Sequence, residues 1–534
     1  MPEKQADVAT EGPSGIDPVR SSGEPDIPPS RHRWMILSVV CVTVLIVNLD
    51  NTVVNVALPT LVRDLNASSS DLEWIVDAYI IVFAGLLLAA GSLADRVGRK
   101  KTFLAGLVIF AACSGWAAFS GSVNMLVTAR VCMAVGGALM IPSTLAIISN
   151  MFRDPAERQR AIAIWAGTTG LGVALGPIIG GLLLSHFWWG SIFLINVPIA
   201  AVSLLAAIRL IPDSRNPAAL APDLTGAAAS IAGIGLILWA IIEGPVRGWT
   251  SGLVIGVGVD GLVIMGIFFA WERVCSHPML NLRFFRQRSF SAAIPAVATV
   301  SFGLYGALFV LTQYLQFSLG FSPMETGVRL IPAAGTLLLT APFSAVLIRF
   351  LGSKITMGVG LALIAAGLWQ VSSVTTATTF GGTVLGMILL GAGAGLALPT
   401  ATGSVIASVP AGETGVASAT SSTAAQLGGG LGVAIVGSIL STRYQGKVPT
   451  VVSGEHIPTG IMDIIRSSLG GAIAVADMAA APTGDLLAGA ARAAFVNGMA
   501  LATLTAAFVT LAGCLLALAW FPSRPQTSPE DAAE

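Results

Sequence analysis

The stretches LADRVGRKKTFLAGL, residues 93–107, and LIRFLGSKITMGVGL, residues 347–361, follow one pattern at a constant offset of 254 residues. Six positions are identical in this frame, namely Leu93/Leu347, Gly98/Gly352, Lys100/Lys354, Thr102/Thr356, Gly106/Gly360 and Leu107/Leu361. Each stretch begins inside one apolar run and leads into the next. The pattern therefore predicts that the chain contains two related halves.

A second pair of similar segments lies further along each half. GGALMIPST begins at Gly136 and GAGLALPTA begins at Gly393, which places Pro142 opposite Pro399 after a slip of three residues. Helices rich in Gly and Leu share some identities by chance, and chance is the alternative explanation. The matched lysine and proline at equivalent places favour a true internal repeat.

The composition is that of a membrane protein: 54% of the 534 residues are hydrophobic and only 10% are charged. A membrane-spanning helix needs about 20 mostly apolar residues, and apolar runs this long exclude the shorter strands of a barrel. Fourteen runs qualify, at 34–56, 73–94, 102–121, 125–147, 160–183, 189–210, 224–244, 252–271, 290–316, 324–348, 353–374, 380–405, 414–440 and 496–520. We predict an all-α membrane protein with fourteen transmembrane helices.

The repeat assigns the first six spans and the last six to two equivalent bundles. The predicted parts are a disordered cytoplasmic tail (1–33), an N-terminal six-helix bundle (34–210), a two-helix insert (224–271), a C-terminal six-helix bundle (290–520) and a second cytoplasmic tail (521–534). Residues 441–495 are predicted to form an outside loop of short helices between the last two spans, with a fifteenth span as the alternative. Two similar bundles around a cavity are the architecture of an alternating-access transporter.

The charges in the short loops predict the orientation. Lys and Arg gather in the loops at 96–101, 153–160 and 273–288, whereas the opposite short loops carry only Arg63 and Arg247. Because basic loops stay in the cytoplasm, both termini are predicted to be cytoplasmic. The 28 basic and 28 acidic residues balance, so no overall field favours a nucleic acid as partner.

Four motifs together resemble the fourteen-helix drug:proton antiporter branch of the major facilitator superfamily. They are GSLADRVGRKKTF (91–103), LDNTVVNVALP (49–59), LVTARVCMAVGGALMIP (126–142) and GLGVALGPIIGGLLL (170–184). The likeness extends from Trp34 to Trp520, and WIVDAY (74–79) resembles the exporters of quaternary ammonium compounds in particular.

The resemblance implies a multi-pass, proton-coupled exporter of lipophilic cationic or neutral drugs or antibiotics in the bacterial inner (cytoplasmic) membrane. Export of an endogenous lipid or of a self-made natural product is the alternative. The implied partners are the small lipophilic substrate, protons and membrane lipid, and we expect a monomer.

The resemblance also assigns roles to two of the motifs. The loop motif implies a conformational latch, in which Asp95 holds the start of a neighbouring helix while Arg96 and Arg99 latch cytoplasmic helix ends. The latch residues are Gly91, Asp95, Arg96, Gly98 and Arg99. The antiporter motif consists of Gly172, Gly176, Pro177, Gly180 and Gly181. This motif implies outward transport, and its small residues allow two helices to approach closely.

Three ionisable residues are predicted at similar depth within the membrane. Asp50, Asp77 and Arg130 each lie four to six residues from the outer end of their span. Intramembrane charges are costly and usually functional, so we predict that Asp50 couples transport to protons and that Asp77 binds a proton or attracts a cationic drug. A change in the distance to Arg130 would load and release the proton. For Asp77, near a predicted helix end, a purely structural role in capping or pairing is the alternative.

Aromatic and amide side chains are the candidates for the substrate cavity, with packing as the alternative for each. They are Trp74, Tyr79, Trp165, Tyr305, Gln313, Tyr314, Gln316 and Gln426. Related exporters of dications carry further acids in the spans equivalent to 324–348 and 414–440, and Gln426 stands where such an acid is expected. The sequence therefore favours monocationic or neutral substrates. Other acids near spans, Glu243, Glu325 and Glu413, are predicted to cap or to be solvated, and Asp260 to join a second relay or to face the span 224–244.

Other classes of function lack their motifs. The chain has no GxxxxGK[ST] pattern, so it does not bind ATP as a pump would. No HExxH, GxSxG or paired Cys/His pattern occurs, and the five cysteines share no ligand spacing. We therefore expect neither an enzyme nor a metal site, and no cofactor. Both tails are too short for the output domain of a sensor.

Overall fold

The computed structural model describes residues 32–152, 154–214, 222–276, 278–280, 282–409, 414–451, 459–479 and 483–521. Each element in these ranges is helical, and twelve helices are long and apolar enough to cross a membrane. The protein is thus an all-α membrane protein. The predicted tails lie outside the described residues except at positions 32, 33 and 521, and Glu413 lies outside them as well.

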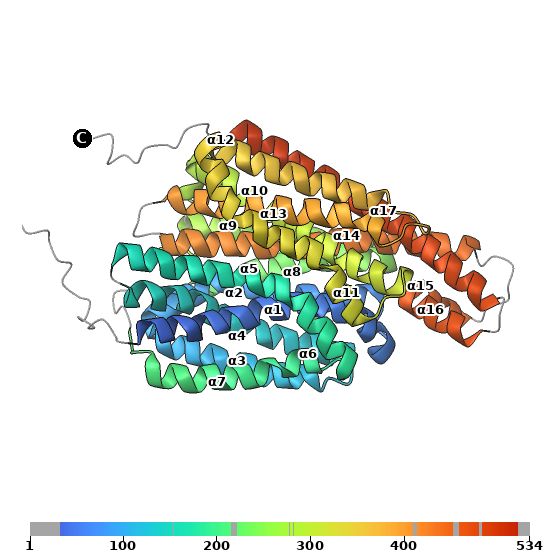
Figure 1. Ribbon diagram of the computed structural model, residues 1–534, viewed down its shortest axis with the longest axis horizontal. Helices are drawn as coiled ribbons and strands as arrows, with labels where there is room; N and C mark the ends of the chain where they lie inside the picture. Colours follow the sequence, from blue (N-terminus) through green and yellow to red (C-terminus); the bar gives the residue numbers. More distant parts are fainter. Residues whose placement is uncertain are drawn as a thin grey trace, which may run out of the picture.

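The first helix group comprises the helices up to residue 210. These are α1 (Arg33–Leu65), α2 (Ser69–Val97), α3 (Arg99–Ala118), α4 (Val123–Met151), α5 (Pro155–His186), α6 (Ser191–Leu194) and α7 (Asn196–Leu210). Helix α4 packs against α2 and α3, α1 packs against α5, and α7 packs against α3. Most of this group occupies the lower half of the molecule in Figure 1.

The second helix group comprises α10 (Arg288–Gln313) and the helices that follow it. A 3₁₀ turn η1 (Phe284–Arg286) precedes α10, and a π-helical turn η2 (Tyr314–Ser318) extends it. The others are α11 (Pro323–Arg329), α12 (Ile331–Ser372), α13 (Gly381–Ala407), α14 (Thr414–Val451), α15 (Thr459–Ser467), α16 (Leu469–Met478) and α17 (Thr483–Trp520). Helix α12 packs against α13 and α17, and α10 packs against α14. Helices α15 and α16 project at one end of the molecule (Figure 1).

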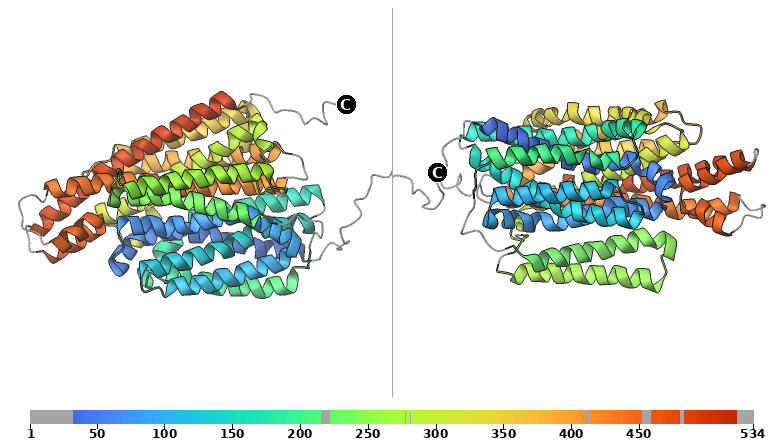
Figure 2. Two further views of the ribbon diagram at one scale, coloured as in Figure 1. Left: turned by 180° about the vertical axis from the view of Figure 1, so that it is seen from behind. Right: turned by 90° about the horizontal axis from the view of Figure 1, so that it is seen from below.

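Two helices between the groups form a separate hairpin. Helix α8 (Leu224–Arg247) packs along α9 (Gly252–Val274) and contacts both α2 and α14. Figure 2 shows this green pair on one side of the molecule. The hairpin therefore lies against both helix groups, through one helix of each.

The repeated glycines occupy matching positions in the two groups. Gly98 and Gly352 both have a positive φ, +123° and +80°, a conformation that favours glycine. Gly352 interrupts α12 with non-helical angles, so α12 consists of two helical pieces. A Cβ atom added at Gly106 would lie 2.8 Å from the carbonyl oxygen of Gly136.

The second group contains the equivalent close approach. A Cβ atom added at Gly360 would lie 2.8 Å from the carbonyl oxygen of Gly393. Gly360 and Gly393 are the repeat partners of Gly106 and of the segment around Gly136. The same four glycines thus bring α3 to α4 and the second piece of α12 to α13, which supports the internal repeat.

The boundary between α1 and α2 differs from the prediction. Helix α1 continues to Leu65 and ends at Asn66, whose φ is +53°. Helix α2 begins at Ser69 because Ser68 and Asp71 form a capping box: the Ser68 N–H donates to Asp71 Oδ2 at 2.8 Å, and the Asp71 N–H donates to Ser68 Oγ at 3.2 Å. Asp77 consequently lies two turns inside α2.

The last two long helices are also longer than predicted. Helix α14 runs to Val451 and α17 starts at Thr483. The segment 441–495 therefore contains two long helix ends as well as the short helices α15 and α16. Within α16, Ser468 accepts a 3.0 Å hydrogen bond from the N–H of Gly471 and so caps the helix.

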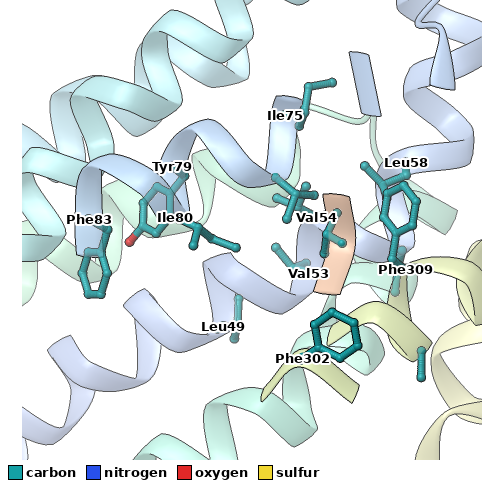
Figure 3. Close-up of a cluster of buried hydrophobic side chains, with 14 of the residues drawn as sticks. Leu49, Val53, Val54, Leu58, Ile75, Tyr79, Ile80, Phe83, Phe302 and Phe309 are labelled. Carbon is teal, nitrogen blue, oxygen red and sulfur yellow. The ribbon is translucent and has the colours of Figure 1, made fainter. Parts of the chain in front are cut away.

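The two groups contact each other at the end that carries α11, α15 and α16, which we call the sealed end. Gln316 Nε2 donates to the carbonyl oxygen of Val56 at 2.8 Å, and Ser69 Oγ donates to that of Ser467 at 2.8 Å. Figure 3 shows the apolar part of this contact, where Phe302 and Phe309 of α10 approach the buried face of α1. Apolar side chains and hydrogen bonds together close this end.

A valine at Gly106 is expected to separate α3 from α4. Overpacking of this kind costs about 1–3 kcal/mol, so Gly106→Val should lower the melting temperature of the purified protein in detergent. The matched control is Gly266→Val on α9, where an added Cβ meets nothing within 4 Å. Equal melting temperatures of the two variants would contradict the proposed tight contact.

Candidate functional site

A buried ion pair joins α1 to α4. Arg130 Nη1 lies 3.3 Å from Asp50 Oδ2, and the side chains are 1% and 0% exposed. Arg130 Nε donates to the carbonyl oxygen of Ile75 in α2, and the guanidinium lies 4.9 Å from the centre of the Tyr79 ring. A charge removed from water must be compensated in this way. The arginine thereby connects three helices of the first group.

The second oxygen of Asp50 also has a partner. Asn196 Nδ2, at the start of α7, donates to Asp50 Oδ1 at 3.1 Å and contacts Ser114 Oγ at 3.1 Å. Ser114 in turn donates to the carbonyl oxygen of Phe193 at 2.8 Å. The sequence prediction missed Asn196 because a neutral amide at a helix start has no distinctive signal. Residues of α4 and of α7 therefore both bind the Asp50 carboxylate.

Asp77 lies in a different environment. It is fully buried, and neither carboxylate oxygen has a hydrogen-bond partner in the described part of the chain. A Cβ atom added at Gly430 of α14 would lie 3.4 Å from Asp77 Oδ1, so the side chain faces the second helix group. The alternative that Asp77 caps α2 is wrong, because Ser68 is the cap and Asp77 lies two turns beyond it.

The glycines of the antiporter motif lie on two faces of α5. A Cβ atom added at Gly172 would lie 2.8 Å from Asn48 Cβ, and one at Gly180 would lie 2.6 Å from Val53 Cγ2, while Gly176 faces Thr52. These three glycines bring α5 against α1 beside Asp50.

The other face of α5 meets the second helix group. A Cβ atom added at Gly181 would lie 2.6 Å from the carbonyl oxygen of Pro323, and Gly327 of α11 faces the carbonyl of Pro177. The motif therefore contributes to the helix contact around Asp50 and also to the sealed end.

A family model matches the chain over residues 40–433, and it is that of the Major Facilitator Superfamily. The chain belongs to this superfamily. A Major Facilitator fold agrees with a solved bacterial homologue of the human lysosomal transporter Spinster, which superposes with a TM-score of 0.65 at 18% identity and covers 93% of this chain and 99% of that one.

Several relatives within the superfamily are efflux proteins. The chain is 36% identical to the multidrug efflux pump LfrA of Mycolicibacterium smegmatis, over 90% of this chain and 95% of the relative. It is 33% identical to the tetracenomycin C resistance and export protein of Streptomyces glaucescens, over 97% and 96% of the two chains. The protein is a Major Facilitator transporter related to multidrug efflux pumps, and it is not an enzyme.

The predicted cavity residues of this transporter do not form one cluster. Tyr79 stacks on Phe83, with ring centres 5.5 Å apart, beside Arg130. Tyr305 packs near Gly429, where an added Cβ would lie 3.1 Å from its ring, next to the Gly430 that faces Asp77. These two tyrosines therefore lie near the buried charges. Gln426 is half-buried on α14.

Other predicted cavity residues have structural contacts instead. Trp74 packs into the apolar cluster between α2 and α8, because it lies on the hairpin side of α2. Tyr314 Oη donates to the carbonyl oxygen of Thr378 at 3.1 Å, and Gln313 Nε2 bonds back to that of Phe309 at 3.2 Å. Trp165 Nε1 donates to Thr144 Oγ1 at 3.0 Å and fixes α5 to α4. Gln316 belongs to the sealed end.

The predicted latch residues lie together at the junction of α2 and α3. Asp95 forms a 2.8 Å ion pair with Arg99, the first residue of α3, and the N–H of Arg99 donates to the carbonyl oxygen of Ser214 at 3.0 Å. Gly91 faces Pro142 of α4, with an added Cβ 3.6 Å from its Cβ. Arg96 is exposed. Asp95 thus holds the start of the neighbouring helix, and it does so through the side chain of Arg99.

The remaining acids have simpler surroundings. Glu325 forms a capping box with Ser322 at the start of α11, which confirms its capping role. Glu243 pairs with Arg247 at 2.8 Å on α8. Asp260 is exposed on α9, so the prediction that it faces the span 224–244 is wrong: Gly258 and Gly261 lie on the side that contacts α8.

An apolar groove of about 420 Å³ lies between α1 and α7, lined by Val39, Val42, Pro198, Ile199, Val202 and Ala206 among others. Val42 and Val202 are exposed, so the groove opens on the outer surface of the bundle. Because no charged side chain lines it, we do not assign the substrate to it.

The sequence analysis missed three buried acids, Glu73, Asp223 and Glu272, and of these Glu73 lies between the two helix groups. Glu73 is 1% exposed and lies at the contact of α2 with α14. The sequence prediction placed it at the first position of a span, where an acid is unremarkable. The signature Ser68-x-x-Asp71 would have moved the helix start four residues earlier and placed Glu73 inside the helix.

Removing Arg130 while Asp50 remains is expected to destabilise the protein strongly. Arg130→Met should lower the free energy of unfolding by up to about 3–5 kcal/mol, because an unpaired carboxylate then remains buried. The double variant Asp50→Asn/Arg130→Met should recover most of that loss, which a double-mutant cycle of unfolding measurements would show. Simple additivity of the two single effects would contradict a direct interaction.

Proposed function

We propose that this protein exports lipophilic drugs or antibiotics, cationic or neutral, across the bacterial cytoplasmic membrane in exchange for protons. The observation that carries the proposal is the buried Asp50–Arg130 pair beside the glycines of α5, with an unpaired Asp77 facing the second helix group. Intramembrane carboxylates of this kind serve proton relays. The relation to multidrug efflux pumps supports drugs as cargo.

The proposed topology has fourteen spans. The break at Gly352 divides the apolar segment Pro323–Ser372, 50 residues long, into two crossings, and α5, whose apolar part is Gly170–His186, adds another. The two six-helix bundles are then 34–210 and 290–520, with 224–271 as the insert and 441–495 as the outside loop. The basic loops at 96–101 and 273–288 support cytoplasmic positions for both termini.

With this orientation the sealed end faces outward and the latch at Gly98 faces the cytoplasm. Alternating access requires that the sealed end opens while the opposite end closes. Helices α1 and α4 would shift relative to each other during that exchange, and Asp50 would then lose or regain Arg130 as a partner. A carboxylate binds a proton when its cation moves away and releases it when the cation returns. Substrate and proton would thereby use the cavity in turn, in a protein that we propose to act as a monomer.

Asp77 is proposed to attract the cationic part of a substrate. It has no cation of its own among the described residues, and it faces α14 near Tyr305, whose ring offers a further contact for a cation. Proton binding at Asp77 is the alternative role.

A self-made natural product is a second candidate cargo. One relative, 33% identical over nearly the whole chain, is a tetracenomycin C resistance and export protein. The apolar and aromatic surroundings of the buried charges would accept a lipophilic natural product as readily as a drug.

Asp50→Asn is expected to abolish proton exchange. In inverted vesicles the acidified lumen should lose protons when a transported dye is added to wild-type protein, because each dye molecule enters as protons leave. The variant should show no such dye-induced pH change, whereas the control Asp260→Asn, an exposed acid of α9, should behave as the wild type. An undiminished pH change in Asp50→Asn would refute the coupling role.

Asp77→Asn is expected to separate cationic from neutral substrates. In a pump-deficient bacterial host, resistance to monocationic dyes should fall about tenfold, the effect of losing roughly 1.4 kcal/mol of attraction. Resistance to neutral antibiotics should remain. Asp260→Asn again serves as the control. Equal loss for both classes would assign Asp77 to proton binding instead, and wild-type resistance to everything would exclude both roles.

A further inference from the structure

Glu73 lies where three parts of the molecule meet. It is on the second turn of α2, is 1% exposed, and faces Gly437 of α14. A Cβ atom added at Gly437 would lie 2.6 Å from the carboxyl carbon of Glu73, so glycine at this position leaves room for the acid. The neighbouring Ser438 contacts α8 of the hairpin. Glu73 is therefore enclosed by the first helix group, the second helix group and the insert.

The hydrogen bonds of Ser438 indicate which form of Glu73 fits this enclosure. Ser438 Oγ lies 2.7 Å from the carbonyl oxygen of Ile241 and 3.3 Å from Glu73 Oε2. A serine hydroxyl has one proton to donate, and a carbonyl oxygen can only accept. When Ser438 donates its proton to Ile241 at 2.7 Å, it can share that proton with an ionised Glu73 only in a long, weak contact, whereas a protonated Glu73 can donate a hydrogen bond of its own to Ser438 Oγ.

None of the charged groups described around Glu73 forms an ion pair with it. On its own helix, Asp77 follows one turn later and is acidic; on α8, Glu243 is paired with Arg247 at 2.8 Å. Arg443 of α14 is exposed and turned toward Gly498 of α17, and Arg130 of α4 is bound to Asp50. No ion pair joins Glu73 to any described residue. An ionised carboxylate in a water-free contact without a cation is strongly disfavoured.

We propose that Glu73 is a further proton-binding site of this transporter, and that a proton taken from the external side holds the contact between α2 and α14 closed. The inference rests on the proposed alternating access. When α2 and α14 separate, Glu73 meets external water and ionises; closure then requires that its carboxylate takes one proton back from the same side. The proton returns to the side it came from, so Glu73 gates the outer opening and adds no translocated charge.

Closure of the sealed end should therefore depend on external pH. Spin labels at the exposed positions Asp64 of α1 and Arg466 of α15, in the full-length chain with its five native cysteines replaced, report the distance between the two groups by double electron–electron resonance. The short-distance population should be complete at low pH and decline as pH rises. Near the midpoint the ratio of closed to open molecules should change by about tenfold per pH unit, as for one proton.

The variants separate Glu73 from the other acids. Glu73→Gln, whose neutral amide can still donate to Ser438, should stay closed across the whole pH range, whereas the control Asp260→Asn, at an exposed acid of α9, should keep the wild-type midpoint. Ser438→Ala should move the midpoint to lower pH, because the protonated form loses its acceptor. A pH response of Glu73→Gln equal to that of the wild type, or an unmoved midpoint in Ser438→Ala, would overturn the assignment.

A flux measurement distinguishes a gate from a second coupling site. In inverted vesicles, Glu73→Gln should exchange the same number of protons per dye molecule as the wild type. A lower number would show that Glu73 translocates a proton and would overturn the gating role. The distance measurement needs no transport, so it remains interpretable even if Asp50→Asn were to leave proton exchange intact and the proposed function failed.

Discussion

The cost of a charge in the membrane governs the arrangement of the first helix group. Arg130 is the largest fully buried side chain among the described residues. It is acceptable there because Asp50, the carbonyl oxygen of Ile75 and the Tyr79 ring surround it. Since those partners belong to three helices, compensating one guanidinium fixes how α1, α2 and α4 pack. The proposed transport cycle uses the same dependence, because a helix movement that weakens the pair would favour the protonated acid.

Backbone contact through glycine is the second determinant of the fold. Apolar side chains gain little by meeting each other in lipid, so close packing supplies much of the attraction between helices. The pairs Gly106/Gly136 and Gly360/Gly393 provide it within each group, and Gly172, Gly176 and Gly180 provide it between α5 and α1. Gly181 and Gly327 extend it across the two groups. Contacts without long side chains can separate and re-form with little rearrangement, which suits the opening that we propose for this surface.

Asp50, Asp77 and Glu73, the buried acids of α1 and α2, differ in what compensates them, and this difference suggests a division of labour. The Asp50 carboxylate contacts the Arg130 guanidinium and the Asn196 amide. Asp77 has no hydrogen-bond partner among the described residues, and Glu73 contacts the Ser438 hydroxyl. Both Asp77 and Glu73 face glycines of α14. The span 414–440 lacks an acid of its own, as noted for Gln426, yet α2 presents two carboxyl groups to it. At the contact of α2 with α14, the buried carboxyl groups therefore come from α2 and not from α14.

The sequence by itself determined the all-α membrane class, the internal repeat and the residues Asp50, Asp77 and Arg130, because apolar length, matched glycines and rare intramembrane charges are local signals. It misplaced the start of α2 by four residues, and with it the surroundings of Asp77 and Glu73. Only the tertiary structure decided that Asn196 holds Asp50, that Trp74 faces the hairpin and that Asp260 is exposed. These facts depend on which face of a helix meets which neighbour, and in a helix apolar on nearly every side the sequence carries no periodic signal for that choice.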